Sequence, residues 1–587
     1  MNASAVKFLL VALMHHAAFT QDIPFITRKD GVLFEGDKPF RFVSYDAPGL
    51  FMTEDRPPCE KQLFGIPVCP VYPLNNPAFD KDGYAYGTVK GTGSKCIENL
   101  VSCRQSFPES FVDDNNQWEI SSKYEQEDLI QTVALMSGRV IRTFPFLIGV
   151  KQHIDSLRSY YEPAWVAVDH AIATARKHNV RLIIPFINNH WRGDDSPPSL
   201  ASEIGYWTKL RKLPPSAFYT NKDLIDDFKH FITFVLNRVN TVTGVRYGDD
   251  PTIMAWETGN ELGGAGVPQP ELAQTASWTI DIAKHIKSLA PKTLVMDGRS
   301  CKRECPSELH KETLQSEFLD IFSVHYYDPD DYDRIGRDTE FVTGFGKAFM
   351  IGEFGMEDTG SYKPLIDAGF KTKVSGFLYW SLRGHGEYGG FNSHKEVFGV
   401  EASRLSVHAP GFEPKANFSG DEKDVAEMML GFARQFAGVD TNSGFPEPPA
   451  AQPLDVAVHP ARLRFKGSSW ALKYTMFRQV CQDASCKTVA EDWKTVTNIQ
   501  DSVVQGNAVW SETDESLRDK FLRYQIQPEG RTGKIGPNAT IGPYKFSNDS
   551  LPQLNHATSH GSRDFSNAKN AILQISIAFA ILTTKIQ

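Results

Sequence analysis

Short apolar runs alternate with amphipathic stretches over the first two thirds of this chain. The runs are β-branched or aromatic and almost continuous, which is typical of strands that are buried on both faces of a parallel sheet. The sequence predicts eight such strands, at residues 40–45, 140–146, 182–187, 252–256, 293–296, 319–325, 348–351 and 376–380.

Helical periodicity lies between several of these strands. Apolar positions from Trp165 to Ala175 recur at three- and four-residue spacing, and two further apolar stripes cover 228–239 and 272–289. Eight strands that alternate with helices predict an α/β fold of the (β/α)8 TIM-barrel type. The alternative, an open doubly wound sheet, would need a Gly-rich phosphate-binding turn after its first strand, where this chain has Asp-Ala-Pro-Gly at 46–49.

The pattern changes after residue 440. A Pro-rich segment at 441–454 predicts a stiff linker, and alternating apolar positions beyond it predict a small all-β sandwich over 455–548. In its Trp and Tyr spacing this stretch loosely resembles a fibronectin type III-like module. We expect the barrel domain to cover 21–440, with a Pro-, Gly- and Cys-rich insertion at about 49–125 lying over one barrel face.

Both ends of the chain carry apolar segments that are typical of processing signals. Residues 1–20 have a short apolar core and a small-residue cleavage site, which predicts a secretory signal peptide. Residues 549–587 predict a disordered tail that ends in a short apolar stretch after small and polar residues, the pattern of a GPI-type lipid-anchor signal. A plain apolar tail is the alternative. We therefore expect a secreted protein that is anchored at the cell surface if the second signal is used.

The eight cysteines fall into pairs that are close in sequence, which favours disulfides over a metal site. The expected bonds are Cys59–Cys69, Cys96–Cys103, Cys301–Cys305 and Cys481–Cys486. Asn417, Asn538 and Asn548 each open an Asn-x-Ser/Thr sequon, the acceptor for N-glycosylation in an exported protein.

Composition and charge narrow the class of partner. The chain is 41% hydrophobic and 12% aromatic, which is enough for packed cores and excludes wholesale disorder. Its net charge of -9 is spread along the sequence, whereas a nucleic-acid-binding protein would show a clustered basic face. A neutral substrate suits such a surface.

Two glutamates stand in distinctive frames, each at the end of a predicted strand. Glu261 closes the segment Ile-Met-Ala-Trp-Glu-Thr-Gly-Asn-Glu, and Glu353 lies in Met-Ile-Gly-Glu-Phe-Gly. Two carboxylates that meet in one pocket are what cleavage of a glycosidic bond requires. In a barrel the site lies at the carboxyl ends of the strands, and the polar or aromatic residues found there are Arg142, His190, Asn260, Glu261, His325, Tyr327, Glu353 and Trp380.

These residues and their order resemble glycoside hydrolase family 5 (cellulase family A) over about residues 30 to 400. Within that family the strand sequences are closest to the plant and fungal endo-β-1,4-mannanases. The resemblance implies that Glu261 is the general acid/base and Glu353 the nucleophile of a retaining, double-displacement hydrolysis. It also implies that Asn260 binds the sugar 2-hydroxyl and that Arg142 and Tyr327 keep Glu353 ionised and oriented.

For the remaining positions the resemblance implies that His325 tunes the acid/base and that Trp380 forms the floor under the reacting sugar. His190, beside two asparagines, is expected to contact substrate, with a packed core histidine as the alternative. Glu257 lies four residues before Glu261, inside the predicted strand, and is expected to be a buried structural acid. We expect no metal and no organic cofactor.

The substrate is less well defined than the chemistry. Leu262 follows the acid/base where the family usually has Pro, and 191–195 replaces the usual Tyr-Gly-Gly run. Both positions lie on the rim that contacts sugar. The sequence predicts a mannan-type polysaccharide as the partner of a monomeric endo-β-1,4-mannanase. A β-1,4-glucanase, an exo-β-mannosidase or a wall transglycosylase could use the same machinery, and a non-catalytic wall-binding protein is the alternative of a different class.

Overall fold

The structure is a computed structural model. It describes residues 23–53, 60–61, 67–68, 119–149, 151–189, 204–263, 274–301, 305–355, 359–386, 390–392, 407–411, 422–457, 462–500, 509–512 and 514–546.

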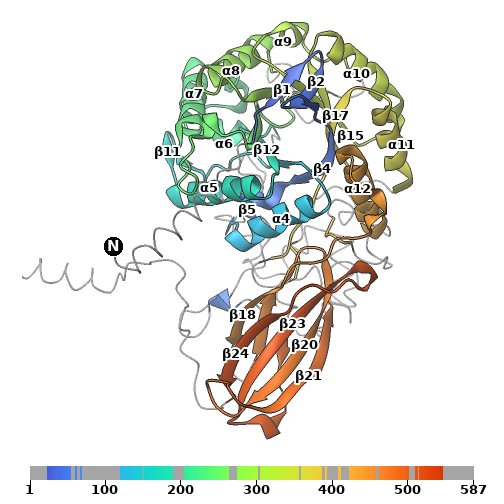
Figure 1. Ribbon diagram of the computed structural model, residues 1–587. Helices are drawn as coiled ribbons and strands as arrows, with labels where there is room; N and C mark the ends of the chain where they lie inside the picture. The colour runs from blue at the N-terminus through green and yellow to red at the C-terminus, as the bar shows by residue number, and fades with distance from the viewer. Residues whose placement is uncertain are drawn as a thin grey trace, which may run out of the picture.

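Parallel strands close into a barrel in the upper half of Figure 1. In order around the barrel they are β4 (Phe42–Ala47), β9 (Val140–Thr143), β12 (Arg181–Pro185), β13 (Ile253–Glu257), β14 (Leu294–Asp297), β15 (Ile321–Tyr326), β16 (Ala348–Phe354) and β17 (Val374–Tyr379). Every residue of β4, β9, β12, β13, β14, β16 and β17 is buried, as the near-continuous apolar runs require. The predicted (β/α)8 barrel is confirmed.

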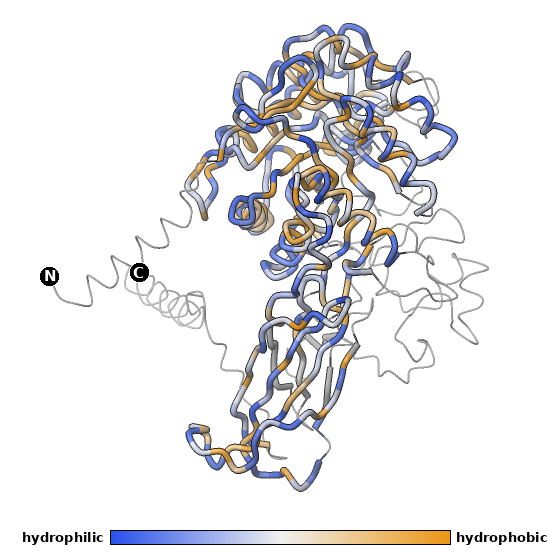
Figure 2. Tube along the Cα trace, turned by 45° about the vertical axis from the view of Figure 1, so that its right-hand side comes forward, coloured by the Kyte–Doolittle hydropathy of each residue, from blue (hydrophilic) through white to orange (hydrophobic). Residues whose placement is uncertain are grey.

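Helices form a ring outside the strands (Figure 1). They are α4 (Lys123–Leu135), α5 (Glu162–Lys177), α6 (Ile204–Lys209), α7 (Lys222–Asn237), α8 (Ala276–Leu289), α9 (Lys311–Gln315), α10 (Ile335–Gly344), α11 (Thr359–Phe370) and α12 (Glu422–Ala437). The stripe that begins at Trp165 faces the strands in α5, because Trp165, Val168 and Ile172 are fully buried there. Figure 2 shows the result, with hydrophobic positions gathered inside the barrel and hydrophilic ones outside.

A short N-terminal sheet closes the barrel at the end where the strands begin. It consists of β1 (Ile26–Lys29), β2 (Val32–Glu35) and β3 (Lys38–Pro39). Leu33 joins a buried cluster with Val140 and Ile183 from the strand starts. Glu35 accepts hydrogen bonds from Arg139 at 2.7 Å and from Arg181 at 2.6 Å. The opposite end, where the strands finish, is left for the site.

The C-terminal part is a sandwich of two antiparallel sheets, drawn in orange and red in Figure 1. One sheet contains β18 (Gln452–Ala457), β19 (Arg462–Lys466) and β22 (Val509–Ser511), and the other contains β20 (Ala471–Cys481), β21 (Val489–Gln500), β23 (Phe521–Gly530) and β24 (Ala539–Lys545). Phe465 of one sheet meets Tyr474 of the other with ring centroids 4.6 Å apart, and Met476 and Ile526 are buried beside them. Strand β18 begins at Gln452, within the segment expected to be a linker.

Two of the expected disulfides are present, Cys301–Cys305 and Cys481–Cys486. Asn538 is exposed just before β24. Within the described ranges, no helix is both long and apolar enough to cross a membrane. The two end signals, His190, Asn417, Asn548 and the pairs Cys59–Cys69 and Cys96–Cys103 lie outside the described residues.

Candidate active site

The carboxyl ends of the barrel strands bring together seven of the eight residues that the sequence predicts for the site. Arg142 lies in β9 and Glu353 in β16, while His325 is near the end of β15. Asn260 and Glu261 follow β13, Tyr327 follows β15, and Trp380 follows β17. His190 is the eighth and lies outside the described residues.

Arg142 is the centre of a buried polar network. Its guanidinium donates to both oxygens of Glu257 at 2.8 and 2.9 Å and to Glu353 Oε1 at 2.8 Å. It also donates to Asp46 Oδ1 at 3.2 Å and to Asn260 Oδ1 at 2.6 Å. The side chain is 1% exposed, so every one of these contacts is shielded from water. A planar fork of five N–H donors suits this task, and from β9 the arginine contacts residues of β4, β13 and β16 at once.

His325 lies between the two glutamates. Its Nδ1 is 2.9 Å from Glu261 Oε1 and 3.2 Å from Glu353 Oε2. One carboxylate oxygen of each glutamate and this ring nitrogen all lie within 4.8 Å of one another. Retaining glycosidases place their carboxyl groups about 5 Å apart, whereas inverting enzymes leave roughly 6.5 Å or more for a water. The spacing therefore fits direct attack by one carboxylate.

Glu353 is arranged to stay ionised. Burial raises the pKa of its carboxyl, but the positive charges of His325 and Arg142 outweigh it and hold the pKa below the ordinary value of 4.5. Tyr327 donates to Glu353 Oε2 at 2.6 Å and thereby fixes the orientation of the carboxylate. Burial lowers the pKa of His325, yet the negative charges of Glu353 and Glu261 prevail and raise the pKa to about 10. The imidazole is thus a cation at neutral pH.

The backbone at Glu261 is held in an uncommon conformation. Glu261 has a φ of 50°, in the left-handed region that non-glycine residues seldom adopt. Asn260 N donates to Ile187 O at 2.7 Å and Leu262 N donates to Gly298 O at 2.9 Å, so both neighbouring strands hold the segment. A Cβ at Gly298 would lie 1.5 Å from the Gly259 carbonyl oxygen, so only glycine fits below this turn.

Trp380 closes the site on the side of β17. The residue is 8% exposed, its ring centroid lies 6.5 Å from that of Phe144, and its backbone N donates to Phe354 O at 2.9 Å. Glu353 directly precedes Phe354. This one hydrogen bond between adjacent strands therefore links the positions of Glu353 and Trp380. An indole beside carboxylates is an apolar surface on which a sugar ring can pack.

Glu261, His325 and Glu353 could also each offer one ligand atom to a cation. The carboxylates are nevertheless satisfied by protein groups, because His325 contacts both of them and Tyr327 and Arg142 donate to Glu353. Contacts of this kind also suit acid/base and nucleophilic chemistry.

Two members of the network were not among the predicted site residues. Asp46 directly follows the first predicted strand, so the strand-end criterion that found the others would have found it as well. Asn188 accepts from Asn260 Nδ2 at 3.1 Å and thereby orients that amide. Glu257 is fully buried in its pairing with Arg142, as a structural acid would be.

Known proteins resemble the middle of the barrel. Residues 150–334 match the model of a family described as GH family 5 beta-mannosidase-like. This part of the chain is therefore similar to family 5, β-mannosidase-like domains. The matched range holds Asn260, Glu261, His325 and Tyr327, and the fold adds Arg142, Glu353 and Trp380 from both sides of it.

Plant relatives and a bacterial structure show the extent of the likeness. The chain is 34% identical over 181 residues to a putative mannan endo-1,4-beta-mannosidase 5 of Oryza sativa subsp. japonica, over 30% of this chain and 35% of that protein. It is 36% identical over 189 residues to mannan endo-1,4-beta-mannosidase 7 of Arabidopsis thaliana, over 30% and 42% of the two chains. These matches span less than half of either relative. The endo-beta-1,4-mannanase of Thermotoga petrophila superposes with a TM-score of 0.44 at 18% identity, over 73% of this chain and 95% of that one.

Proposed function

We propose that this protein is a retaining β-glycoside hydrolase that cuts β-1,4-mannan internally. The observation that carries the proposal is the short separation of Glu261 and Glu353, with His325 in contact with both of them. Arg142 and Tyr327 both donate to Glu353, whereas Glu261 contacts His325 and is the more exposed of the two carboxylates. Two acids in unequal surroundings are the requirement for acid and nucleophile to coexist.

The reaction then proceeds in two displacements. Glu353 attacks the anomeric carbon while Glu261 protonates the departing glycosidic oxygen, so the C–O bond breaks as the glycosyl–Glu353 ester forms. Glu261, now a carboxylate, takes a proton from a water molecule, and the oxygen of that water attacks the same carbon. This step releases Glu353 and leaves the sugar with its original anomeric configuration.

Neighbouring groups complete the proposed machinery. Asn260 is fixed by Arg142 and Asn188, which suits an amide that must hold the sugar 2-hydroxyl as charge develops. Trp380 provides the apolar floor. The mannan preference rests on the similarity to plant mannan endo-1,4-beta-mannosidases, which covers only part of their length.

Activity assays test both the chemistry and the substrate. Purified protein should release oligosaccharides from mannan and glucomannan, and 1H NMR of the first products should show the β-anomer. Glu353→Gln should abolish turnover on every substrate while leaving binding of mannopentaose in place. Activity on carboxymethyl cellulose alone would instead identify a β-1,4-glucanase, release of mannose alone an exo-β-mannosidase, and longer products a transglycosylase. Binding without turnover in the unsubstituted protein would refute hydrolysis.

We also propose that the protein acts outside the cell. The disulfides Cys301–Cys305 and Cys481–Cys486 form in oxidising compartments, and Asn538 offers an exposed glycosylation sequon. Use of the C-terminal anchor signal and a monomeric state remain predictions. Phospholipase release of protein from intact cells tests the first, and light scattering of purified protein tests the second.

A further inference from the structure

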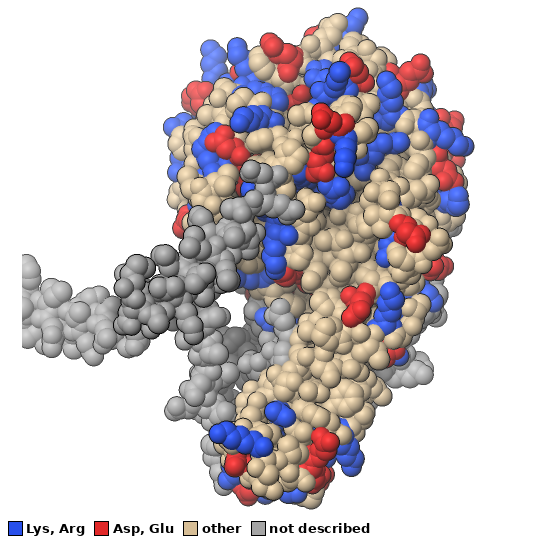
Figure 3. Space-filling model, viewed as in Figure 1, with Lys and Arg blue, Asp and Glu red and all other residues tan. Residues whose placement is uncertain are grey.

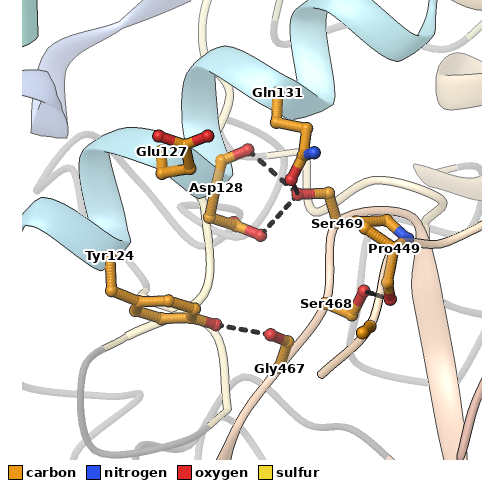
Figure 4. A pocket seen from close by; sticks show the side chains of 9 residues that line it. Tyr124, Glu127, Asp128, Gln131, Pro449, Gly467, Ser468 and Ser469 are labelled. Carbon is orange, nitrogen blue, oxygen red and sulfur yellow. Dashed lines mark hydrogen bonds between the residues drawn. The ribbon is translucent and has the colours of Figure 1, made fainter. Parts of the chain in front are cut away.

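A buried carboxylate joins the barrel to the C-terminal sandwich. Asp128 of α4 is 3% exposed and accepts hydrogen bonds from the His385 backbone N at 2.8 Å and from His385 Nδ1 at 3.0 Å. It also accepts from the hydroxyl of Ser469 at 2.9 Å, as Figure 4 shows. His385 belongs to the barrel segment after β17, whereas Ser469 lies in the sandwich turn between β19 and β20. Two distant parts of the chain therefore meet on one side chain.

The sandwich turn 467–470 is fitted closely around this carboxylate. Gly467 packs flat against the His385 ring, since a Cβ at Gly467 would lie 2.0 Å from His385 Cδ2. Tyr124 donates to Gly467 O at 2.9 Å (Figure 4). Trp470 is 1% exposed, donates its indole N–H to Thr132 O at 2.9 Å and belongs to the hydrophobic core of the barrel. The turn is thus built into the barrel surface and does not merely touch it.

The barrel segment that the turn holds leads straight to the site. His385 is five residues beyond Trp380. Between them, Leu382 N donates to the backbone oxygen of Asp46, whose carboxylate pairs with Arg142. The segment 380–386 is therefore held at three points. Trp380 bonds to Phe354, Leu382 to Asp46, and His385 to Asp128.

We propose that Asp128 is a positioning residue for the active site and that the sandwich turn 467–470 completes the position of segment 380–386. The inference rests on the proposed function, because it concerns the placement of Trp380 under the reacting sugar. Three donors converge on the two carboxylate oxygens of Asp128, so loss of one partner frees the others to move. A shift of about 1 Å in a positioning element can lower a rate by roughly 100-fold.

Two substitutions in the full chain test this. Asp128→Asn keeps the shape of the side chain but replaces one acceptor oxygen with an NH2 group, which faces the donors of His385 or Ser469. Ser469→Ala removes only the donor from the sandwich. Each should lower kcat/KM on mannopentaose, by about 10- to 100-fold for Asp128→Asn, and the loss should include an increase in KM because the sugar floor moves. The matched control is Asp169→Asn: Asp169 of α5 is also fully buried and accepts from Tyr247 at 2.6 Å and Thr241 at 2.8 Å, away from this segment.

Hydrogen–deuterium exchange supplies a readout that does not depend on activity. Backbone amides of 381–386 should exchange faster in Asp128→Asn and Ser469→Ala than in the unsubstituted protein, and at an unchanged rate in Asp169→Asn. If the unsubstituted protein cuts no glycan, the proposed function fails while this comparison still decides the positioning. Unchanged exchange and unchanged kinetics in both variants, or equal kinetic losses in Asp169→Asn, would overturn the inference and leave the cluster a purely structural contact.

Discussion

At the scale of single residues, the charge on His325 controls the ionisation of the nucleophile candidate. The pKa of Glu353 is held below 4.5 by His325 and Arg142 against the effect of burial, so activity should persist as pH falls to that value and below. His325→Asn removes one of these cations, and the pKa of Glu353 should rise. The acidic limb of kcat/KM should then move to higher pH in a pH–rate profile of this variant, and an unmoved limb would contradict the pairing.

The same residue makes stability depend on pH. The pKa of His325 is about 10 in the folded protein and about 6.5 when it is unfolded, so its contribution to stability is present below pH 6.5 and is lost as pH rises through 10. Unfolding free energies of the parent and of His325→Asn, measured by urea titration from pH 6 to 10, should therefore converge toward the alkaline end. A constant difference would show that the folded histidine is neutral.

The separate roles of the two glutamates can be distinguished by leaving group. Glu261→Ala should lower kcat on mannan by about 10²- to 10⁴-fold, the usual worth of a general acid. Dinitrophenyl β-mannoside needs no proton to depart, so its cleavage to the glycosyl-enzyme should survive in this variant. Glu353→Ala should lose activity on both substrates. Stopped-flow release of dinitrophenol measures the difference, and equal losses in the two variants would show that the roles are misassigned.

At the scale of elements, the turn after β13 depends on one glycine of the next strand. Gly298 follows β14 directly, and an added methyl would meet the carbonyl of Gly259. Gly298→Ala should displace Asn260 and Glu261, abolish most activity and cost about 1–3 kcal/mol of stability through overpacking. Gly344→Ala in α10 is the matched control, because no atom lies within 4 Å of its added Cβ. Activity assays and thermal melts of both variants should differ sharply.

Element by element, the sequence predicts the barrel well because its signals are local. Buried parallel strands read as continuous apolar runs, and the strand-end criterion then places Arg142, Glu261 and Glu353 in one pocket. Asp46 also meets this criterion and was not chosen, because nothing in the sequence pairs it with an arginine 96 positions away. The role of Gly298 was equally hidden, since a close approach between two strands leaves no local pattern.

At the scale of the whole molecule, the sandwich is less separate than its sequence suggests. Trp470 reads as one more apolar position of a strand, yet its side chain lies in the barrel core. Both charge signs are interspersed over the barrel surface, while few charges line the junction with the sandwich in the view of Figure 3. Long-range packing of this kind cannot be read from periodicity, because periodicity indicates which face is buried and not against what.

This shared core predicts that the two parts unfold together. A calorimetric scan of the full chain should show one cooperative transition. Trp470→Ala should lower the free energy of unfolding by about 3–5 kcal/mol, as removal of a buried aromatic side chain does. It should also split the scan into two transitions, because the sandwich then no longer packs in the barrel core.

Trp493→Ala is the control: Trp493 is only partly buried on the outer side of the sandwich, where its ring centroid lies 5.2 Å from the guanidinium carbon of Arg523. That change should cost about 1 kcal/mol and keep a single transition. Two transitions in the unsubstituted protein would show instead that barrel and sandwich are thermodynamically independent.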